Sequence, residues 1–542
     1  MSQIFSDKKN SRTLIFSAIP VSLSFLLSRI LGLLRDRLFA SRFGAGPELD
    51  AYFAAYRIPD LIYSLLVLGT LTAAFLPVFA TYLAKGEEGK KEAFDVARSL
   101  FTITVLILMI SAGVLFVLAP QLVKFMAPGF DDERAKLMVT MSRIMLLQPI
   151  LLGASSIIGS ILTSFNRFIA YAAAPVLYNL GIIFGVLFFV PRMGVQGIAW
   201  GVVLGAILHF LIQVPSSLKV GFNFRPKLTF ENEGLIQIGR MVVPRLISLA
   251  ASQVESLIVT FIGSMYIAGS IAVYTFAGNL QAVPIGLIGI SFAMAVFPQL
   301  SISAANNSRE VFVNSLVRTM RLILYYILPF SVAMLLLRAQ IVRVVLGSGK
   351  FSWTDTQLTL TVLGILVLAV FSESLKQLLA RAFFSLQDTK TPMISSIIGI
   401  LVNVVGAYYL GRQYGVAGLA MSFTISSILQ LLILLTIIHQ RLEGLHDKEF
   451  IQSVLKMCLA TLLAGAAIQI LKYPVAALVN MQTFLGVFIQ LVVTSVGGVL
   501  VYIGMSKLLK LEEFEFMFQT IKNFLKRKSV PSAKEVVLSE DD

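Results

Sequence analysis

The chain has 542 residues, of which 57% are hydrophobic and only 13% are charged, and its mean hydropathy is +0.85. Soluble domains carry about 25% charged residues, so this composition excludes a soluble globular protein and indicates a polytopic membrane protein. The net charge of +15 is expected to lie in basic cytoplasmic loops, and no nucleic-acid partner is predicted.

Stretches of about 20 mostly apolar residues follow one another along the chain, as expected for membrane-spanning helices. The predicted fold class is all-α, with about 14 transmembrane helices. In chain order the expected spans are 14–43, 50–84, 97–120, 137–163, 168–191, 194–216, 238–264, 269–303, 314–338, 358–386, 390–411, 414–439, 451–472 and 483–508. Lys and Arg gather in alternate loops, such as "AKGEEGKKE" and "SLKVGFNFRPK", which predicts that both termini are cytoplasmic.

Charged residues interrupt the first expected span in the stretch "SRILGLLRDR". Arg29, Gly32 and Asp36 are spaced to share one helix face, and Arg35 is adjacent to that face. A charge inside a bilayer is costly and therefore tends to mark a functional site. Arginine suits bidentate contacts with phosphate oxygens, so this pattern predicts a basic site for a phosphate-bearing ligand.

The second span opens with "DAYFAAYRIPD", which adds Asp50 and Arg57 to the candidate site. The carboxylates are expected to orient the arginines. A structural alternative is that the arginines extend to the outer lipid headgroups. We expect this alternative for Arg37 and Arg42, whereas Arg29 lies too near the middle of its span.

Similar segments recur at a constant spacing of 221 positions. The matched positions are Pro77 and Pro298, Phe165 and Leu386, and Gly194 and Gly415. Six spans in each copy predict a parallel repeat, in which the substrate binds between two lobes that rock against each other. The predicted domains are an N-lobe at 1–217, a C-lobe at 218–442, two further helices at 443–510, and a cytoplasmic amphipathic helix and tail at 511–542.

The second half carries fewer charges inside its expected spans. Arg245 and Asn279 are candidate substrate contacts, and Glu255 is a mid-span carboxylate that we assign as the candidate for a coupling ion. Glu373 and Lys376 are three positions apart on one helix and are expected to neutralise each other.

The chemistry of the chain is expected to be binding rather than catalysis. The sequence holds no Walker motif and no nucleophile with a paired base. Its single cysteine, Cys458, excludes an intrachain disulfide, and no cofactor or metal is predicted. The energy for transport is therefore expected to come from an ion gradient or the membrane potential.

Several motifs resemble those of the MurJ (MviN) family of lipid II flippases, in the multidrug/oligosaccharidyl-lipid/polysaccharide exporter superfamily. They are "SRILGLLRDRLFASRFGAGPELDAYFAAYRIPDL", "GTLTAAFLPVFATYLAKG", "VPIGLIGISFAMAVFPQLS" and "ARAFFSLQDTKTP". The resemblance implies fourteen spans, a V-shaped cavity between the lobes, and a groove in the last two helices for a polyprenyl tail. Arg29, Arg35, Asp36 and Asp50 match charged positions that the family uses in its cavity.

The implied activity is transport of lipid II, an undecaprenyl-diphosphate-linked disaccharide-pentapeptide, to the outer leaflet of the bacterial cytoplasmic membrane for cell-wall synthesis. The implied partners are lipid II, membrane lipids and cell-wall synthesis enzymes.

The sequence also departs from the family pattern. Positions where family members carry an arginine or a glutamate hold Tyr63, Leu68 and Asn279, and sodium-site aspartates are replaced by Val259 and Ala407. The residues that we expect to compensate are Arg57, Arg245 and Glu255.

Three other functions are compatible with the same residues. A flippase for a different polyprenyl-diphosphate oligosaccharide needs the same basic site, and competition binding between headgroups would distinguish it. A cation-coupled drug exporter would need a net acidic cavity, whereas the first-span cluster is net basic. The third function is that of a non-transporting scaffold for cell-wall enzymes. In that case a folded but transport-dead variant would restore the function lost on depletion.

Overall fold

The computed structural model describes residues 8–228 and 233–525, without the side chains at 8–22, 25, 68–74, 239–252, 255, 521 and 523–525. In these residues every regular element is helical. The α-helices are α1 Lys8–Phe43, α2 Pro47–Tyr63, α3 Thr72–Leu83, α4 Gly86–Met126, α5 Asp132–Met145, α6 Leu147–Ser164, α7 Phe168–Phe184, α8 Val190–Met193, α9 Gln196–Leu211, α10 Val214–Lys219, α11 Glu233–Gly263, α12 Ser270–Pro284, α13 Ser291–Ala305, α14 Arg309–Leu336, α15 Arg338–Val345, α16 Trp353–Val367, α17 Val370–Ser385, α18 Lys390–Tyr414, α19 Val416–Arg441, α20 Asp447–Leu478, α21 Phe484–Leu508 and α22 Glu512–Leu525. The π-helical segments are η1 Ser64–Leu71, η2 Gly185–Phe189 and η3 Ile285–Ile290.

The helices agree with the spans expected from hydropathy, and the all-α fold class is confirmed. Within the described residues, ten helical runs are long and apolar enough to cross a membrane, and α16 with α17, bent by 43°, makes an eleventh. The expected spans 14–43, 50–84 and 238–264 overlap α1, α2 to α3, and α11. Because each of these three contains side chains that are not described, the full number of fourteen stays a prediction.

The chain folds into two compact units, each built from segments that are not consecutive in the sequence. One, here called unit 1, comprises Met1–Phe276, Val345–Thr359 and Asn403–Leu419. The other, unit 2, comprises Ala277–Val344, Leu360–Val402 and Ala420–Asp542. The four sequence domains expected above stay a prediction.

Glycines allow α7 and α9 of unit 1 to approach closely. A Cβ built on Gly181 would lie 2.3 Å from the Cα of Gly205, and one on Gly185 would lie 2.4 Å from the Cα of Gly201. Small residues four positions apart are the usual way for membrane helices to pack backbone against backbone. Substitution of these glycines would push α7 and α9 apart.

The 221-residue repeat is visible in local backbone conformation. Segments η1 and η3 begin 221 positions apart, and both belong to helices that contain prolines, which cannot donate a helical hydrogen bond. Three pairs of residues with positive φ have the same spacing: Gly86 and Asn307, Asn166 and Gln387, and Gly194 and Gly415. Equal spacing of π-segments and left-handed turns supports the repeat inferred from the sequence.

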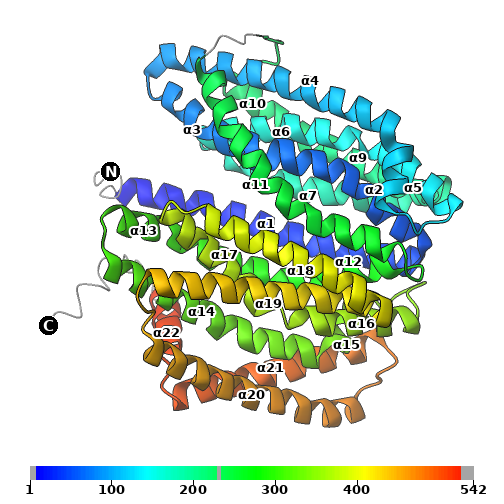
Figure 1. Ribbon diagram of the computed structural model, residues 1–542, viewed down its shortest axis with the longest axis vertical. Helices are drawn as coiled ribbons and strands as arrows, with labels where there is room; N and C mark the ends of the chain where they lie inside the picture. Colours follow the sequence, from blue (N-terminus) through cyan, green and yellow to red (C-terminus); the bar gives the residue numbers. More distant parts are fainter. Residues whose placement is uncertain (1–7, 229–232, 526–542) are drawn as a thin grey trace. The chain divides into compact units, whose positions relative to one another are not determined.

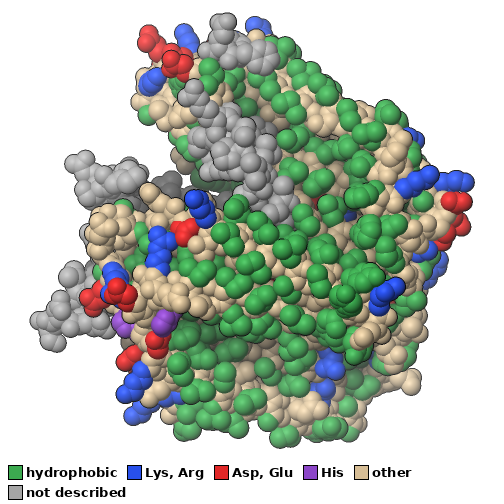
Figure 2. Space-filling view, in the orientation of Figure 1, with side chains coloured by type: hydrophobic (Ala, Val, Ile, Leu, Met, Phe, Trp, Pro, Cys, Tyr) green, Lys and Arg blue, Asp and Glu red, His purple; other side chains and the backbone are tan. Residues whose placement is uncertain are grey.

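In unit 2, α20 and α21 run side by side near the end of the chain (Figure 1). The amphipathic helix expected after 510 is present as α22, which Arg321 of α14 holds through ion pairs with Glu512 and Glu513 at 2.8 and 2.5 Å. Figure 2 shows mostly hydrophobic side chains along the helices of the face in view, with charged side chains chiefly near the helix ends. This distribution suits helices whose middle portions contact lipid.

Candidate functional site

Helix α1 carries the charged stretch of the first span, and the structure gives Arg35 and Asp36 a common site. The Nε and Nη2 atoms of Arg35 donate to Oδ1 of Asp36 at 3.1 and 2.9 Å, and Nη1 donates to Oδ1 of Asn179 in α7 at 3.4 Å. The Asp36 side chain is 4% exposed and that of Arg35 is 23% exposed. The predicted role of Asp36 in orienting an arginine therefore has a structural basis in this ion pair.

Asn179 ties α7 to α1 and was missed by the sequence analysis. Its Nδ2 donates to Oγ of Ser28 and to the carbonyl of Pro175, both at 3.1 Å. An amide within the apolar run "VLYNLGIIF" was the available signal, because a buried polar side chain needs partners. Asn179 thus fixes the α1 register and the position of the Arg35 guanidinium together.

Arg29 lies two turns before Arg35 and is exposed. It forms no ion pair with any described residue, and a Cβ built on the nearby Gly32 would meet no atom within 4 Å. Arg37 is partly buried, whereas Arg42 near the end of α1 is exposed. The α1 cluster, defined as Arg29, Arg35 and Asp36, therefore has more positive than negative charge.

A second group of hydrogen-bonded polar side chains joins α2 to α6 and α7. The sequence analysis missed these residues as well. The hydroxyls of Tyr56 and Tyr178 are 3.0 Å apart, and Nε2 of Gln148 donates to the Tyr56 hydroxyl at 3.1 Å. Tyr178 directly precedes Asn179, so the same turn of α7 contributes a residue to each of the two hydrogen-bonded groups. The neighbouring Arg57 has a buried Nε without a hydrogen-bond partner among the described residues.

Asp50 lies at the start of α2 and is almost fully buried. Its two carboxylate oxygens accept the backbone N–H groups of Gly269 at 2.6 Å and Ala272 at 2.8 Å. These N–H groups belong to the residue just before α12 and to its first turn, where helical partners are lacking. Both oxygens of Asp50 thus take part in a helix cap, which the sequence alone did not predict.

The remaining predicted site residues, Asn279, Arg245 and Glu255, stay predictions. Asn279 is partly buried in α12 and belongs to unit 2. The side chains of Arg245 and Glu255 lie outside the described residues, although both positions are helical. Val259 and Ala407 are buried apolar residues, so they supply no side-chain oxygen for a cation.

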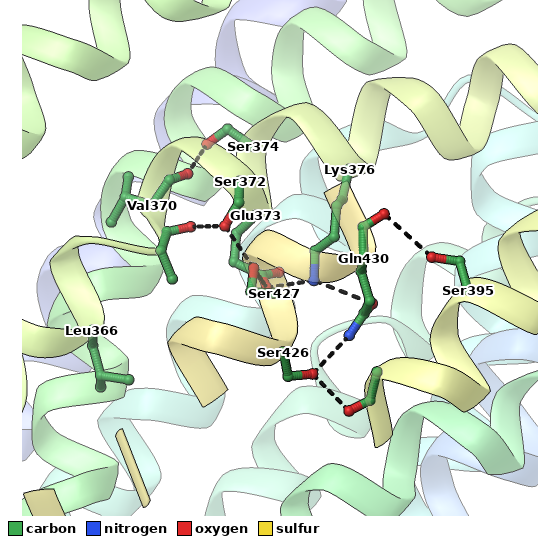
Figure 3. A network of polar contacts seen from close by, with 12 residues as sticks. Leu366, Val370, Ser372, Glu373, Ser374, Lys376, Ser395, Ser426, Ser427 and Gln430 are labelled. Carbon is green, nitrogen blue, oxygen red and sulfur yellow. Dashed lines mark hydrogen bonds and ion pairs between the residues drawn. The ribbon is translucent and has the colours of Figure 1, made fainter. Parts of the chain in front are cut away.

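The charged pair of unit 2 lies in a network of polar contacts (Figure 3). Nζ of Lys376 lies 2.6 Å from Oε1 of Glu373, which also accepts from Oγ of Ser427 at 2.7 Å. Oε1 of Gln430 lies 3.4 Å from the same Nζ. The expected mutual neutralisation of Glu373 and Lys376 is confirmed, with Ser372 completing the network through Ser427 at 2.6 Å.

An apolar cavity of ≈350 Å³ lies between α14, α20 and α21 of unit 2. Its wall includes Tyr326, Pro329, Ile468 and Val499. In the described part of the chain, no group of three or more His, Cys, Asp or Glu residues is placed to hold a metal ion.

Comparisons with known proteins identify the family. Residues 39–489 match the family model described as lipid II flippase MurJ. The probable lipid II flippase MurJ of Buchnera aphidicola subsp. Acyrthosiphon pisum is 29% identical over 507 residues, which cover 92% of this chain and 98% of that protein. The corresponding Vibrio cholerae protein is 28% identical, over 80% of this chain and 84% of its own length.

Solved structures agree with this assignment. A structure of lipid II flippase MurJ in an inward closed conformation has a TM-score of 0.74 at 25% identity, covering 90% of this chain and 98% of that one. An inward-facing multidrug resistance MATE family transporter of the MOP superfamily has a TM-score of 0.63 at 15% identity, which is a likeness of fold alone. The chain belongs to the MurJ family of lipid II flippases, and it is accordingly a multi-pass membrane transporter rather than an enzyme.

Proposed function

We propose that the chain transfers lipid II from the inner to the outer leaflet of the bacterial cytoplasmic membrane by alternating access, and that the α1 cluster binds its diphosphate. Family membership supports the substrate class. The observation that supports the binding site is the net positive charge of the cluster, in which Asp36 pairs with Arg35 while Arg29 stays exposed.

The geometry of Arg35 suits a fixed phosphate ligand. Asp36 and Asn179 together accept three hydrogen bonds from its guanidinium, which has five N–H donors. Two donors remain for a ligand, and the planar group is already held in place, which lowers the entropic cost of binding. Arg29, two turns away on the same helix, supplies a second positive charge.

Arg57 is the second candidate contact. A buried donor without a partner costs about 1–3 kcal/mol, so its unsatisfied Nε suits a ligand oxygen or a water at this position. Asp36 is assigned to orientation. Asp50 is assigned to positioning α12, since both of its oxygens cap that helix. Arg245, Asn279 and the coupling role of Glu255 complete the proposal as predictions.

The apolar cavity between α14, α20 and α21 is assigned to the polyprenyl tail. Its wall is almost wholly apolar, which suits an isoprenoid chain. The distribution of basic loops supports cytoplasmic termini. An ion gradient or the membrane potential is the proposed energy source.

The direct test is exposure of lipid II to an externally added enzyme in cells depleted of this protein. We expect exposure to fall on depletion and to recover with the wild-type chain, but not with Arg29→Ala or Arg35→Ala. Arg42→Ala is the matched control on the same helix, and it should recover fully because Arg42 is exposed near the helix end.

Unchanged exposure on depletion would reject the lipid II assignment. Normal recovery with both Arg29→Ala and Arg35→Ala would reject the phosphate site. Competition by another polyprenyl-diphosphate glycan, but not by lipid II, would reassign the substrate within the same chemistry.

A further inference from the structure

Arg143 is a charged residue on the apolar surface of unit 1 that the proposed flipping site does not use. It lies in α5, beside a stripe of exposed apolar side chains on α4 and α6. Ile110, Val117 and Leu147 in this stripe are 66%, 68% and 45% exposed. In a membrane protein, such a surface faces acyl chains.

A proline in α4 creates the anchor for this arginine. Pro120 has no N–H, so the carbonyl of Phe116, four residues earlier, lacks its helical donor. Nε of Arg143 donates to that carbonyl at 3.0 Å, and the guanidinium carbon lies 4.6 Å from the centroid of the Phe116 ring. The guanidinium is thereby held at the level of Phe116 rather than left to extend along the helix toward water.

Arg143 lacks a counter-charge within the part of the chain that the structure describes. Among the residues that the structure describes, no carboxylate lies within ion-pair distance of it, and its Nη groups make no hydrogen bond there. A guanidinium that faces lipid without an anion is costly, and such residues mark functional sites. An anion supplied from outside the chain would provide this counter-charge.

The space beside Arg143 can hold an apolar chain. A surface cavity of ≈520 Å³ is lined by Arg143 together with Gly113, Phe116 and Trp200. A Cβ built on Gly113 would meet no atom within 4 Å, so this glycine leaves the floor of the cavity open. In α4, Gly113 is about one turn farther from the 127–131 loop than Phe116 is. An acyl chain that lies along Gly113 would therefore extend toward the bilayer centre.

We propose that this cavity binds an anionic phospholipid, with the phosphodiester on Arg143 and one acyl chain against Gly113 and Phe116. Arginine pairs with phosphate oxygens through two parallel N–H groups, and the net charge of an anionic head would neutralise the guanidinium. Trp200, four residues into α9, suits the boundary between headgroup and acyl chain. Under the proposed orientation, the 127–131 loop is outside and the lipid belongs to the outer leaflet.

The test is thermal unfolding of the full chain in nanodiscs of phosphatidylcholine, with and without added phosphatidylglycerol. We expect phosphatidylglycerol to raise the Tm of the wild type by about 2 °C or more. Arg143→Gln should lose most of this rise. Gly113→Leu should lose it as well while keeping the arginine, because the leucine fills the cavity. Arg192→Gln is the charge-matched control outside the cavity and should keep the full rise.

Equal stabilisation of the wild type by the two lipids would overturn the proposal. A full rise in both Arg143→Gln and Gly113→Leu would also overturn it. If soluble glycerophosphoglycerol reproduces the rise in phosphatidylcholine discs, the site takes a free phosphodiester and the lipid assignment fails. Because unfolding is measured without transport, none of these outcomes bears on the flipping of lipid II.

Discussion

The α1 cluster of unit 1 and the Glu373–Lys376 network of unit 2 both place charges inside membrane helices, but they balance them differently. In unit 2, one carboxylate meets one ammonium, and serine and glutamine side chains add a hydrogen bond to each. In unit 1, Asp36 pairs with Arg35, while Arg29 stays exposed without an ion pair to a described residue.

We expect this difference to separate charges that stabilise the fold from charges that bind a ligand. A pair without net charge attracts a charged substrate only weakly, because its two charges already compensate each other. A net positive cluster with unused donors gains free energy when an anion arrives. Four sets of substitutions, in the α1 cluster, in the Glu373–Lys376 network and at two further carboxylates, test this distinction between structural and ligand-binding charges.

The largest effect on transport is expected for Arg35→Lys. Lysine keeps the charge but loses the planar fork that serves Asp36, Asn179 and a phosphate together. A charged hydrogen bond is worth about 1.5–3 kcal/mol, so flipping should fall by about tenfold or more at normal protein abundance. Reconstituted transport measures this, with Arg42→Lys as the control; a flipping rate equal to that of the control would assign Arg35 a structural role only.

Substitutions in the Glu373–Lys376 network are expected to lower the stability of the protein rather than its transport activity. Removing one partner of a largely buried pair costs up to about 3–5 kcal/mol, because it leaves the other charge without compensation. Glu373→Gln and Lys376→Met should each lower Tm, whereas the double variant should recover most of the loss and still flip lipid II. A double variant that is stable yet inactive would show that unit 2 uses this charge pair for transport.

Asp50→Asn is expected to have an intermediate effect. The asparagine oxygen can accept from Gly269 or Ala272, but its amide cannot accept from the other, which leaves one buried N–H unsatisfied. The cost should be about 1–3 kcal/mol, with faster amide hydrogen exchange at the start of α12. Glu48→Gln, an exposed change in the same turn of α2, is the control, and equal exchange in the two variants would contradict the cap.

The smallest effect is expected at Asp388, in the turn before α18. The backbone N–H of Thr391 holds the pKa of Asp388 below its usual range, and Arg441 pairs with the carboxylate at 2.8 Å. Asp388→Asn should cost about 0.2–1 kcal/mol at neutral pH, because it removes the charge that pairs with the partly exposed Arg441. Because the folded pKa is lowered, this contribution is complete above about pH 4 and is lost as the pH falls through the folded value. Thermal unfolding of both proteins should therefore converge in acid; a constant difference would exclude the carboxylate charge as the cause.

Much of this molecule could be predicted from its sequence, because long apolar runs leave few alternatives to helices in lipid. The ion pair of Glu373 with Lys376 also followed from sequence, since residues three apart on a helix are neighbours. The partners of Arg35 and Asp50 did not, because Asn179 and Gly269 are separated from them by 144 and 219 positions. Arg143 was missed for the same reason, since its acceptor is freed by a proline on another helix.

The sequence by itself determined the helical spans, the 221-residue repeat, the excess of positive charge in the first span, and the family. Only the tertiary structure decided which charges pair with another described residue and which do not. The physical reason is that periodicity specifies which residues share a face of one helix. The partner of a buried charge depends instead on which faces of different helices pack together.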